Sequence, residues 1–286
     1  MKIKPIAFDS FGARSMCTVV ETKDLKIIID PSVALGPKRY GLPPHEIEIR
    51  RKEELWQKIK QEILNADVVI ITHYHYDHHN PNEPEVLAGK ILLTKHPTQA
   101  INRSQMGRSA YFLQKLKELK NPPKIEFADS KVFELGDVQI VFSKPVFHGK
   151  DSRLGFVLEV CIDDGKERFV YTSDVEGATQ EDQIAFIVES EPDVVFMDGP
   201  MTYQPYIFGN KLLERSIENV SKLMEKTKVR EIILDHHLTR DLKWRERIDR
   251  IFKKAEEHGV KVKSAAEFGK IREELLEARR KELYGH

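Results

Sequence analysis

Short apolar runs alternate with polar turns and longer amphipathic stretches along the chain. The first three runs are rich in β-branched residues and have short polar connections, which predicts paired strands at residues 3–8, 16–21 and 25–30. Residues 32–44 are rich in Gly and Pro and predict a loop. In residues 46–64 apolar positions recur at helical spacing, which predicts an amphipathic helix. The run Val68–Ile71 that follows predicts a strand buried on both faces.

The rest of the chain continues this alternation. Further strands are predicted at residues 91–94, 124–127, 131–135, 138–144, 155–162, 168–172, 193–197, 231–234 and 260–263. Amphipathic helices are predicted at residues 100–119 and 212–226, with a loop at 201–209. Ser264 and Glu267 form a capping-box pattern, which predicts a last, exposed helix whose charges alternate in sign from Lys270 to Lys281.

Composition indicates no global attraction to nucleic acid or to a membrane surface. Lys and Arg number 46, as do Asp and Glu, so the formal net charge is zero. No apolar stretch approaches membrane-spanning length, and we expect no membrane association. Cys17 and Cys161 lie among apolar or β-branched neighbours, which predicts free core thiols and a reducing, cytoplasmic location.

Potential metal ligands gather directly after the strand predicted at residues 68–71. The stretch reads His73-Tyr-His75-Tyr-Asp77-His78. Imidazole nitrogens and carboxylate oxygens bind zinc and related divalent ions, and so dense a group would repel or stay unsatisfied without a cation. His73 and His75 are one residue apart, so in an extended segment they point the same way. The alternative is a histidine cluster on a solvated loop, or one satisfied by its own hydrogen bonds.

This motif resembles the signature of the metallo-β-lactamase superfamily. The resemblance implies an α/β fold, an αββα four-layer sandwich in which two β-sheets lie between layers of helices, and one or two bound metal ions. We therefore expect residues 1–286 to form a single domain of this type, with helical insertions around residues 45–65 and 98–120. The resemblance covers most of the chain in the order of its strands, but only the first motif is specific in sequence terms.

The resemblance also implies ligands further along the chain. His148 ends a strand and precedes a glycine, where the third histidine of the first metal site falls; a lone structural histidine is the alternative. Asp174 follows the strand that ends, in the family, with a carboxylate bridging two metals; its alternative is a helix N-cap. The last histidine follows the strand at 231–234, and His236 is preferred to His237 because it comes directly after the strand.

Asp30 also ends a predicted strand. In the resembled family an aspartate here lies behind the metal site and orients one of its ligands. An Asx turn before Pro31 is the alternative.

These assignments imply a hydrolytic reaction. One metal would be held by His73, His75 and His148, and a second by Asp77, His78 and His236, with Asp174 between them. The expected cofactors are two divalent ions, Zn²⁺ first, with Fe or Mn as alternatives. Two close ions lower the pKa of a shared water, and the bridging hydroxide attacks a carbonyl or phosphorus centre. Asp77 would also help to orient this nucleophile, which makes it the predicted catalytic residue.

The predicted function is therefore a metal-dependent hydrolase of an ester-like or phosphate-containing small substrate. One alternative is a nuclease acting on RNA or DNA phosphodiesters, with phosphate contacts from Lys38, Arg39, Arg103, Arg108, Lys150, Arg153 and Arg240. Others are an iron-dependent redox or oxygen-using protein and a metal-storing module. A small molecule is the expected partner and nucleic acid the alternative, while the physiological substrate and the oligomeric state are not predicted.

Substrate contacts are expected from loops beside the metal site. The candidates are Arg39 and Tyr40 in the loop 32–44, and Tyr203 and Tyr206 in the loop 201–209; solvated loop residues are the alternative for the first pair. The basic residues after the last histidine are expected on the solvated face of a helix. They are Arg240, Lys243, Arg245 and Arg247.

Overall fold

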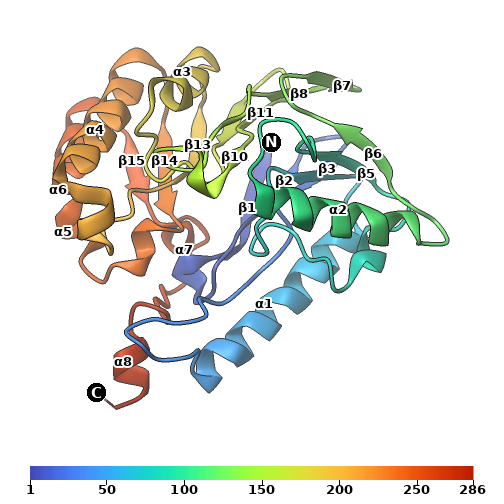
Figure 1. Cartoon of the computed structure of the whole chain (residues 1–286). Coiled ribbons are helices and arrows are strands. Elements are labelled where there is room, and N and C mark those ends of the chain that lie inside the picture. Colours follow the sequence, from blue (N-terminus) through green and yellow to red (C-terminus); the bar gives the residue numbers. More distant parts are fainter. Residues whose placement is uncertain (286) are drawn as a thin grey trace.

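Two mixed β-sheets pack face to face and helices cover their outer faces, as the ribbon shows (Figure 1). The computed structural model describes residues 1–285. One sheet has the strand order β1-β2-β3-β4-β5-β6, and the other has the order β15-β14-β13-β12-β11-β8-β7. Each sheet combines antiparallel strands from the start of its half with parallel strands that follow. The predicted αββα arrangement is confirmed.

The first half of the chain forms the six-stranded sheet. Its strands are β1 (Lys2–Phe8), β2 (Met16–Glu21), β3 (Lys26–Ile29), β4 (Val68–Ile71), β5 (Ile91–Thr94) and β6 (Lys124–Phe127). Its helices are α1 (Glu46–Leu64) and α2 (Arg103–Lys117). Helix α2 begins later than predicted because Asn102 caps it, accepting a hydrogen bond from the backbone N–H of Gln105.

The second half forms the seven-stranded sheet. Its strands are β7 (Val132–Leu135), β8 (Val138–Phe142), β11 (Val160–Asp163), β12 (Arg168–Tyr171), β13 (Val194–Asp198), β14 (Glu231–Asp235) and β15 (Lys261–Lys263). A separate two-stranded sheet joins β9 (Val146–Phe147) to β10 (Phe156–Val157). The larger helices are α3 (Glu181–Glu189), α4 (Pro205–Lys226) and α6 (Asp249–His258), and α5 (Trp244–Arg247) is one turn. The strand predicted at 155–162 is split, because β10 pairs with β9 and β11 pairs with β8 and β12.

The central strands contribute side chains to two hydrophobic layers, one on each face of the sheet. This explains why the sequences of these strands are continuously apolar. In β13, Val194 and Phe196 face the core between the sheets, while Val195 and Met197 face the layer under the outer helices. Phe196 packs its ring against those of Phe169 and Phe268, each at 5.1 Å between centroids. Burial on both faces fixes the register of the central strands, and with it the positions of the residues that follow their ends.

Two predicted segments are wrong in detail. The loop expected at 201–209 becomes helical from Pro205, with a kink at Gly209, whose φ of 70° suits glycine. The exposed helix expected from Lys270 to Lys281 does not form. Its capping box is present at α7 (Ala265–Phe268), but the chain then runs irregularly to α8 (Arg280–Leu283).

Buried contacts explain why the tail is not an exposed helix. The side chain of Arg280 is fully buried, and its Nη2 and Nε donate to the two carboxylate oxygens of Glu48 in α1, at 2.7 and 2.8 Å. It also donates to the carbonyl oxygens of Gly36 and Leu42. Packing against α1 and the loop 32–44 therefore outweighs the helical preference of this sequence.

Both cysteines are buried and free, as predicted. None of the helices described for residues 1–285 is long and apolar enough to cross a membrane.

Candidate metal centre

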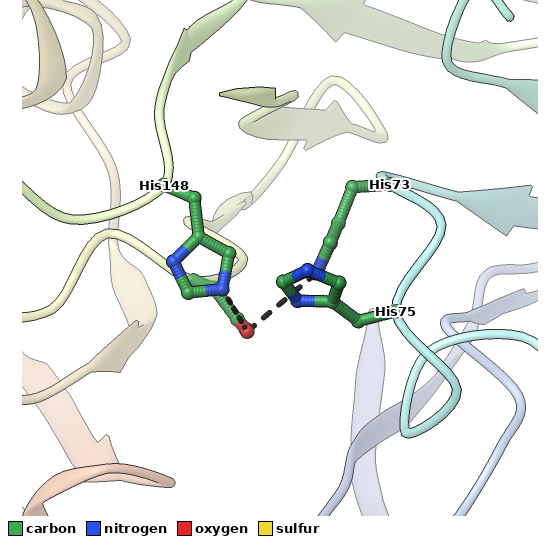
Figure 2. Close-up of side chains that lie close together, drawn as sticks. His73, His75 and His148 are labelled. Atoms are coloured by element: carbon green, nitrogen blue, oxygen red, sulfur yellow. Dashed lines mark ion pairs between the residues drawn. The ribbon is translucent and has the colours of Figure 1, made fainter. Parts of the chain in front are cut away.

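The histidines and aspartates singled out in the sequence meet where strand ends from both halves of the chain approach each other. His73 and His75 follow β4, His148 follows β9, Asp174 lies beyond β12 and His236 follows β14. Figure 2 shows the imidazoles of His73, His75 and His148 turned toward a common point.

One group contains His73, His75, His148 and Asp174. Each offers a ligand atom, and these atoms all lie within 4.8 Å of one another. The Nε2 atoms of His73 and His148 lie 3.6 and 3.0 Å from Oδ2 of Asp174. Three imidazoles and a carboxylate at this spacing can surround one divalent ion.

A second group contains Asp77, His78 and His236, again with ligand atoms within 4.8 Å. Nε2 of His236 lies 3.8 Å from Oδ2 of Asp77 and 3.5 Å from Oδ2 of Asp174. Nε2 of His78 lies 3.0 Å from Oδ1 of Asp174. The carboxylate of Asp174 therefore touches both groups, which is the position required of a bridging ligand.

Unsatisfied polar atoms indicate that these residues fit a metal. Nε2 of His73, Nε2 of His78 and Oδ1 of Asp174 are buried and make no hydrogen bond of good geometry among residues 1–285, although the last two atoms lie 3.0 Å apart. Buried polar atoms are normally hydrogen-bonded, because leaving one unpaired costs its full desolvation penalty. Divalent cations at this point would satisfy all three atoms.

The protonation states of the candidate ligands also fit metal binding. Burial lowers the pKa of His73 well below its usual value and that of His75 to about 3, so both are neutral. Burial opposes charge on His78 too, but the carboxylates of Asp174 and Asp30 raise its pKa to about 10. Burial would raise the pKa of Asp174, yet the imidazoles of His78 and His236 hold it well below its usual value. Neutral imidazoles and ionised carboxylates are metal ligands, and a cation would replace the protons on the remaining imidazoles.

Several residues at the strand ends have left-handed backbone conformations. The φ angles are 47° at Asp30, 56° at Ser173 and 57° at His236, following β3, β12 and β14. Such angles are uncommon outside glycine and persist where the surroundings over-determine them. Here the turn redirects the chain as each strand reaches the site.

Asp30 lies behind the second group. Its carboxylate accepts hydrogen bonds from the backbone N–H and the hydroxyl of Thr72 and from the hydroxyl of Tyr171, and its Oδ2 lies 2.8 Å from Nδ1 of His78. A hydrogen bond at Nδ1 leaves Nε2 free to face a metal and fixes the orientation of the ring.

Sequence reasoning missed three acidic residues that face Nδ1 atoms of histidines at the centre, two of them within hydrogen-bond distance. Oδ2 of Asp9 lies 2.7 Å from Nδ1 of His236, and Oδ2 of Asp198 lies 2.9 Å from Nδ1 of His237. Oε1 of Glu176 lies 3.6 Å from Nδ1 of His148. A signal was present for Asp9 and Asp198, because each comes at the end of an apolar strand, as Asp30 does.

Both histidines after β14 lie close to the centre. His236 is fully buried and belongs to the group with Asp77 and His78, as the sequence reasoning prefers. His237 also brings a ring nitrogen within 4.8 Å of Asp174 and His236, and it lines the adjacent cavity. His79, by contrast, uses Nδ1 to bond the carbonyl oxygen of His75 and packs against Phe112.

The acids behind the ligands give a testable expectation. Replacing Asp30 with asparagine should weaken metal binding by roughly 10- to 100-fold, because the ring of His78 would lose its carboxylate partner. Asp9→Asn should act in the same way through His236. Titration of the metal-free protein with zinc against a competing chelator measures the change. Asp129→Asn is the matched control, because Asp129 bonds Lys95 and the backbone of His96 instead of a candidate ligand. Wild-type zinc affinity in Asp30→Asn would contradict the orienting role.

A cavity of about 790 Å³ opens beside the centre. Candidate ligands in its wall are His75, Asp77, His148 and Asp174. Its basic lining residues are Arg14, Arg108, Lys150, Arg153 and Arg240. The same wall also carries the acidic residues Asp77, Asp151, Asp174 and Glu176, so cations and carboxylates lie side by side in it.

Only one of the four predicted substrate contacts lines this cavity. Tyr203 lines it. Arg39 and Tyr40 are not among its lining residues; the guanidinium carbon of Arg39 stacks between the rings of Tyr40 and Tyr203, at 4.6 and 4.5 Å from their centroids. Tyr206 is fully exposed and outside the lining.

The expectation that Arg240 lies on a solvated helix face is wrong. It is 3% exposed and lies in a 3-10 turn, because the buried carboxylate of Asp9 draws its side chain inward.

Three comparisons extend these observations. Residues 26–237 match the family model described as a beta-lactamase superfamily domain. A UPF0282 protein of Korarchaeum cryptofilum (strain OPF8) is 49% identical over 286 residues, which cover 99% of this chain and 94% of that protein.

Solved structures share the fold at low identity. The metallo-beta-lactamase fold protein YhfI from Bacillus subtilis has a TM-score of 0.54 and 15% identity, over 92% of this chain and 95% of that one. CmlA, a diiron beta-hydroxylase from Streptomyces venezuelae, has a TM-score of 0.57 and 12% identity, over 92% of this chain and 52% of that one. Similarity at this level establishes the fold alone.

Proposed function

The chain belongs to the metallo-β-lactamase superfamily, and on this premise we propose that it is a metal-dependent hydrolase of an ester-like or phosphate-containing small molecule. The observation that carries the proposal is the convergence of buried imidazoles and carboxylates, three of whose facing atoms have no hydrogen-bond partner within the described chain. Superfamily membership alone leaves the reaction open, since one fold supports many chemistries.

Each group of ligands would hold one ion. His73, His75 and His148 would hold the first, and Asp77, His78 and His236 the second, while Asp174 contributes to both. When bound, divalent ions would lower the pKa of a coordinated water. Their positive charge would also stabilise the negative charge that develops on the substrate oxygen.

The chain's own contribution is orientation and proton handling. Burial would raise the pKa of Asp77, but the imidazoles of His78 and His236 lower it below its usual value, so its carboxylate is ionised. Asp77 also lines the cavity. It would therefore accept a hydrogen bond from the attacking water and orient it toward the substrate. Asp30 and Asp9 hold the rings of His78 and His236 in place, so the ligands need not reorganise during the reaction.

The cavity supports a small, anionic substrate over a nucleic acid. Its volume of about 790 Å³ lies within the range of small-molecule sites, roughly 300–1,000 Å³. The basic residues line this cavity, and the zero net charge gives no global positive field for a polyanion. With Asp77 and Asp174 neutralised by bound ions, a phosphate ester would gain more from the cations of this wall than a neutral ester, because charge-assisted hydrogen bonds are the stronger ones.

Metal analysis and an activity panel test this proposal. Protein purified without added metal should contain about two zinc ions per chain by elemental analysis. It should hydrolyse bis(p-nitrophenyl) phosphate or members of a lactone panel faster than RNA, lose this activity on chelation and regain it with zinc. Iron in place of zinc, with no hydrolysis of any panel member, would favour the redox alternative. Hydrolysis that survives complete chelation would refute a metal-dependent mechanism.

A further inference from the structure

Arg240 brings a buried guanidinium to the wall of the cavity beside the candidate metal centre. Its side chain is 3% exposed, and its Nε donates to Oδ1 of Asp9 at 2.6 Å. The other oxygen of Asp9 faces Nδ1 of His236. One carboxylate thus positions both a candidate metal ligand and a permanent positive charge, and Arg240 lines the cavity that the metal ligands line.

Most of the donor capacity of Arg240 is not committed to a strong acceptor. An arginine has N–H groups on three nitrogens, arranged as a planar fork. Nη1 lies 3.5 Å from the hydroxyl oxygen of Tyr203, at the limit of a hydrogen bond. Nη2 lies 3.2 and 3.4 Å from the two ring nitrogens of His236; Nδ1 already faces Asp9, and His236 would also be committed as a ligand if the second ion were bound. The terminal nitrogens therefore remain available to a ligand.

The surrounding contacts hold this arrangement in place. The guanidinium of Arg39 stacks on the ring of Tyr203 and donates to the carbonyl oxygen of Arg240 at 3.1 Å. Arg14, also in the cavity wall, pairs through two nitrogens with the carboxylate of Glu277, at 2.6 Å each. The fork of Arg240 and the hydroxyl of Tyr203 therefore lie on a preorganised wall, which lowers the entropic cost of binding.

We propose that Arg240 and Tyr203 form an oxyanion subsite that binds the phosphoryl oxygens of the substrate next to the candidate metal centre. The subsite deepens the hydrolase proposal, on which it rests for the reaction but not for the binding of phosphate. A planar fork with a neighbouring hydroxyl donor suits the oxygens of a phosphoryl group. Asp77, Asp151, Asp174 and Glu176 also line the cavity, and Asp151 pairs with Arg153. An anion is therefore favoured on the Arg240 side and when cations neutralise Asp77 and Asp174.

Binding of inorganic phosphate to the zinc-loaded protein tests the subsite. Calorimetric titration at fixed ionic strength should give a Kd for Arg240→Gln at least about tenfold above that of the wild type, because charge-assisted hydrogen bonds are lost. The zinc content of this variant should equal that of the wild type. Arg245→Gln is the matched control, since Arg245 is half-exposed, pairs with Glu267 and Glu273 and does not line the cavity; its Kd should be unchanged.

Two results would overturn the subsite. One is wild-type phosphate affinity in Arg240→Gln. The other is a loss of zinc in parallel with the loss of phosphate binding, which would mean that Arg240 only supports His236. If Arg240→Gln does not fold, Tyr203→Phe replaces it: a rise in Kd of roughly 2- to 10-fold supports the subsite, and an unchanged Kd refutes it.

The subsite and the hydrolase proposal fail separately. A protein that binds phosphate through Arg240 but hydrolyses none of the panel substrates would keep the subsite and end the hydrolase proposal. A protein that hydrolyses a panel substrate but has the same Kd for phosphate with and without Arg240 would keep the hydrolase proposal and end the subsite.

Discussion

Asp77→Ala is expected to remove hydrolysis almost completely and to lower the metal content, while the fold survives. Asp77 supplies one of the facing oxygens of the second ligand group and is also the candidate for orienting the attacking water. Its loss removes a metal ligand and a preorganised charge at once, for which we expect a fall in kcat/KM on the order of a thousandfold or more. Elemental analysis and turnover of the best panel substrate measure the two effects.

A surface aspartate provides the comparison. Asp137 lies exposed in the turn between β7 and β8, and Asp137→Ala should change neither metal content nor kcat/KM. Circular dichroism should give the same spectrum for both variants and the wild type. If Asp77→Ala kept full metal content and full turnover, Asp77 would be neither a ligand nor a catalytic residue.

Arg280→Ala should lower the free energy of unfolding by about 3–5 kcal/mol, the cost of removing one partner from a buried ion pair. Both Arg280 and Glu48 are fully buried, so the carboxylate of Glu48 would be left without its counter-charge. Urea denaturation followed by circular dichroism measures the change.

The neighbouring arginine is the natural control for this experiment. Arg279 is half-exposed and its nearest carboxylate oxygen, on Glu282, lies 3.9 Å away, so Arg279→Ala should cost less than about 1 kcal/mol. Equal stability of the two variants would show that the buried pair contributes nothing measurable.

The C-terminal segment also helps to shape the cavity wall. Arg280 donates hydrogen bonds to the carbonyl oxygens of Gly36 and Leu42 in the loop 32–44. The hydroxyl of Tyr40 in the same loop donates to the carbonyl oxygen of Ala278. Glu277 pairs with Arg14 of the cavity lining. The C-terminal segment, which the sequence predicts to be an exposed helix, therefore holds the loop 32–44 and Arg14 in place beside the candidate site.

Local patterns were sufficient for most of the elements. Continuous β-branched runs such as Val68–Ile71 and the helical spacing of residues 46–64 gave strands and a helix with the observed bounds, because burial on one or two faces imposes a period on the sequence. The dense motif from His73 to His78 also marked the candidate site, since its residue types and spacing have few structural uses other than metal binding.

Only the tertiary structure decided which distant polar residues meet. Asp9 and His236 are 227 positions apart, and Arg280 and Glu48 are 232 positions apart, yet each pair is buried and in contact. The periodicity of apolar and polar residues does not reveal such contacts, because a charged residue counts as polar whether it faces water or a charged partner inside the protein. For this reason the sequence predicts solvent exposure for Arg240 and for the segment from Lys270 to Lys281, whereas in the structure Arg240 and Arg280 are buried. The sequence by itself determined most of the strands and helices and the first candidate ligands, and the packing of the two sheets determined which carboxylates and cations surround those ligands.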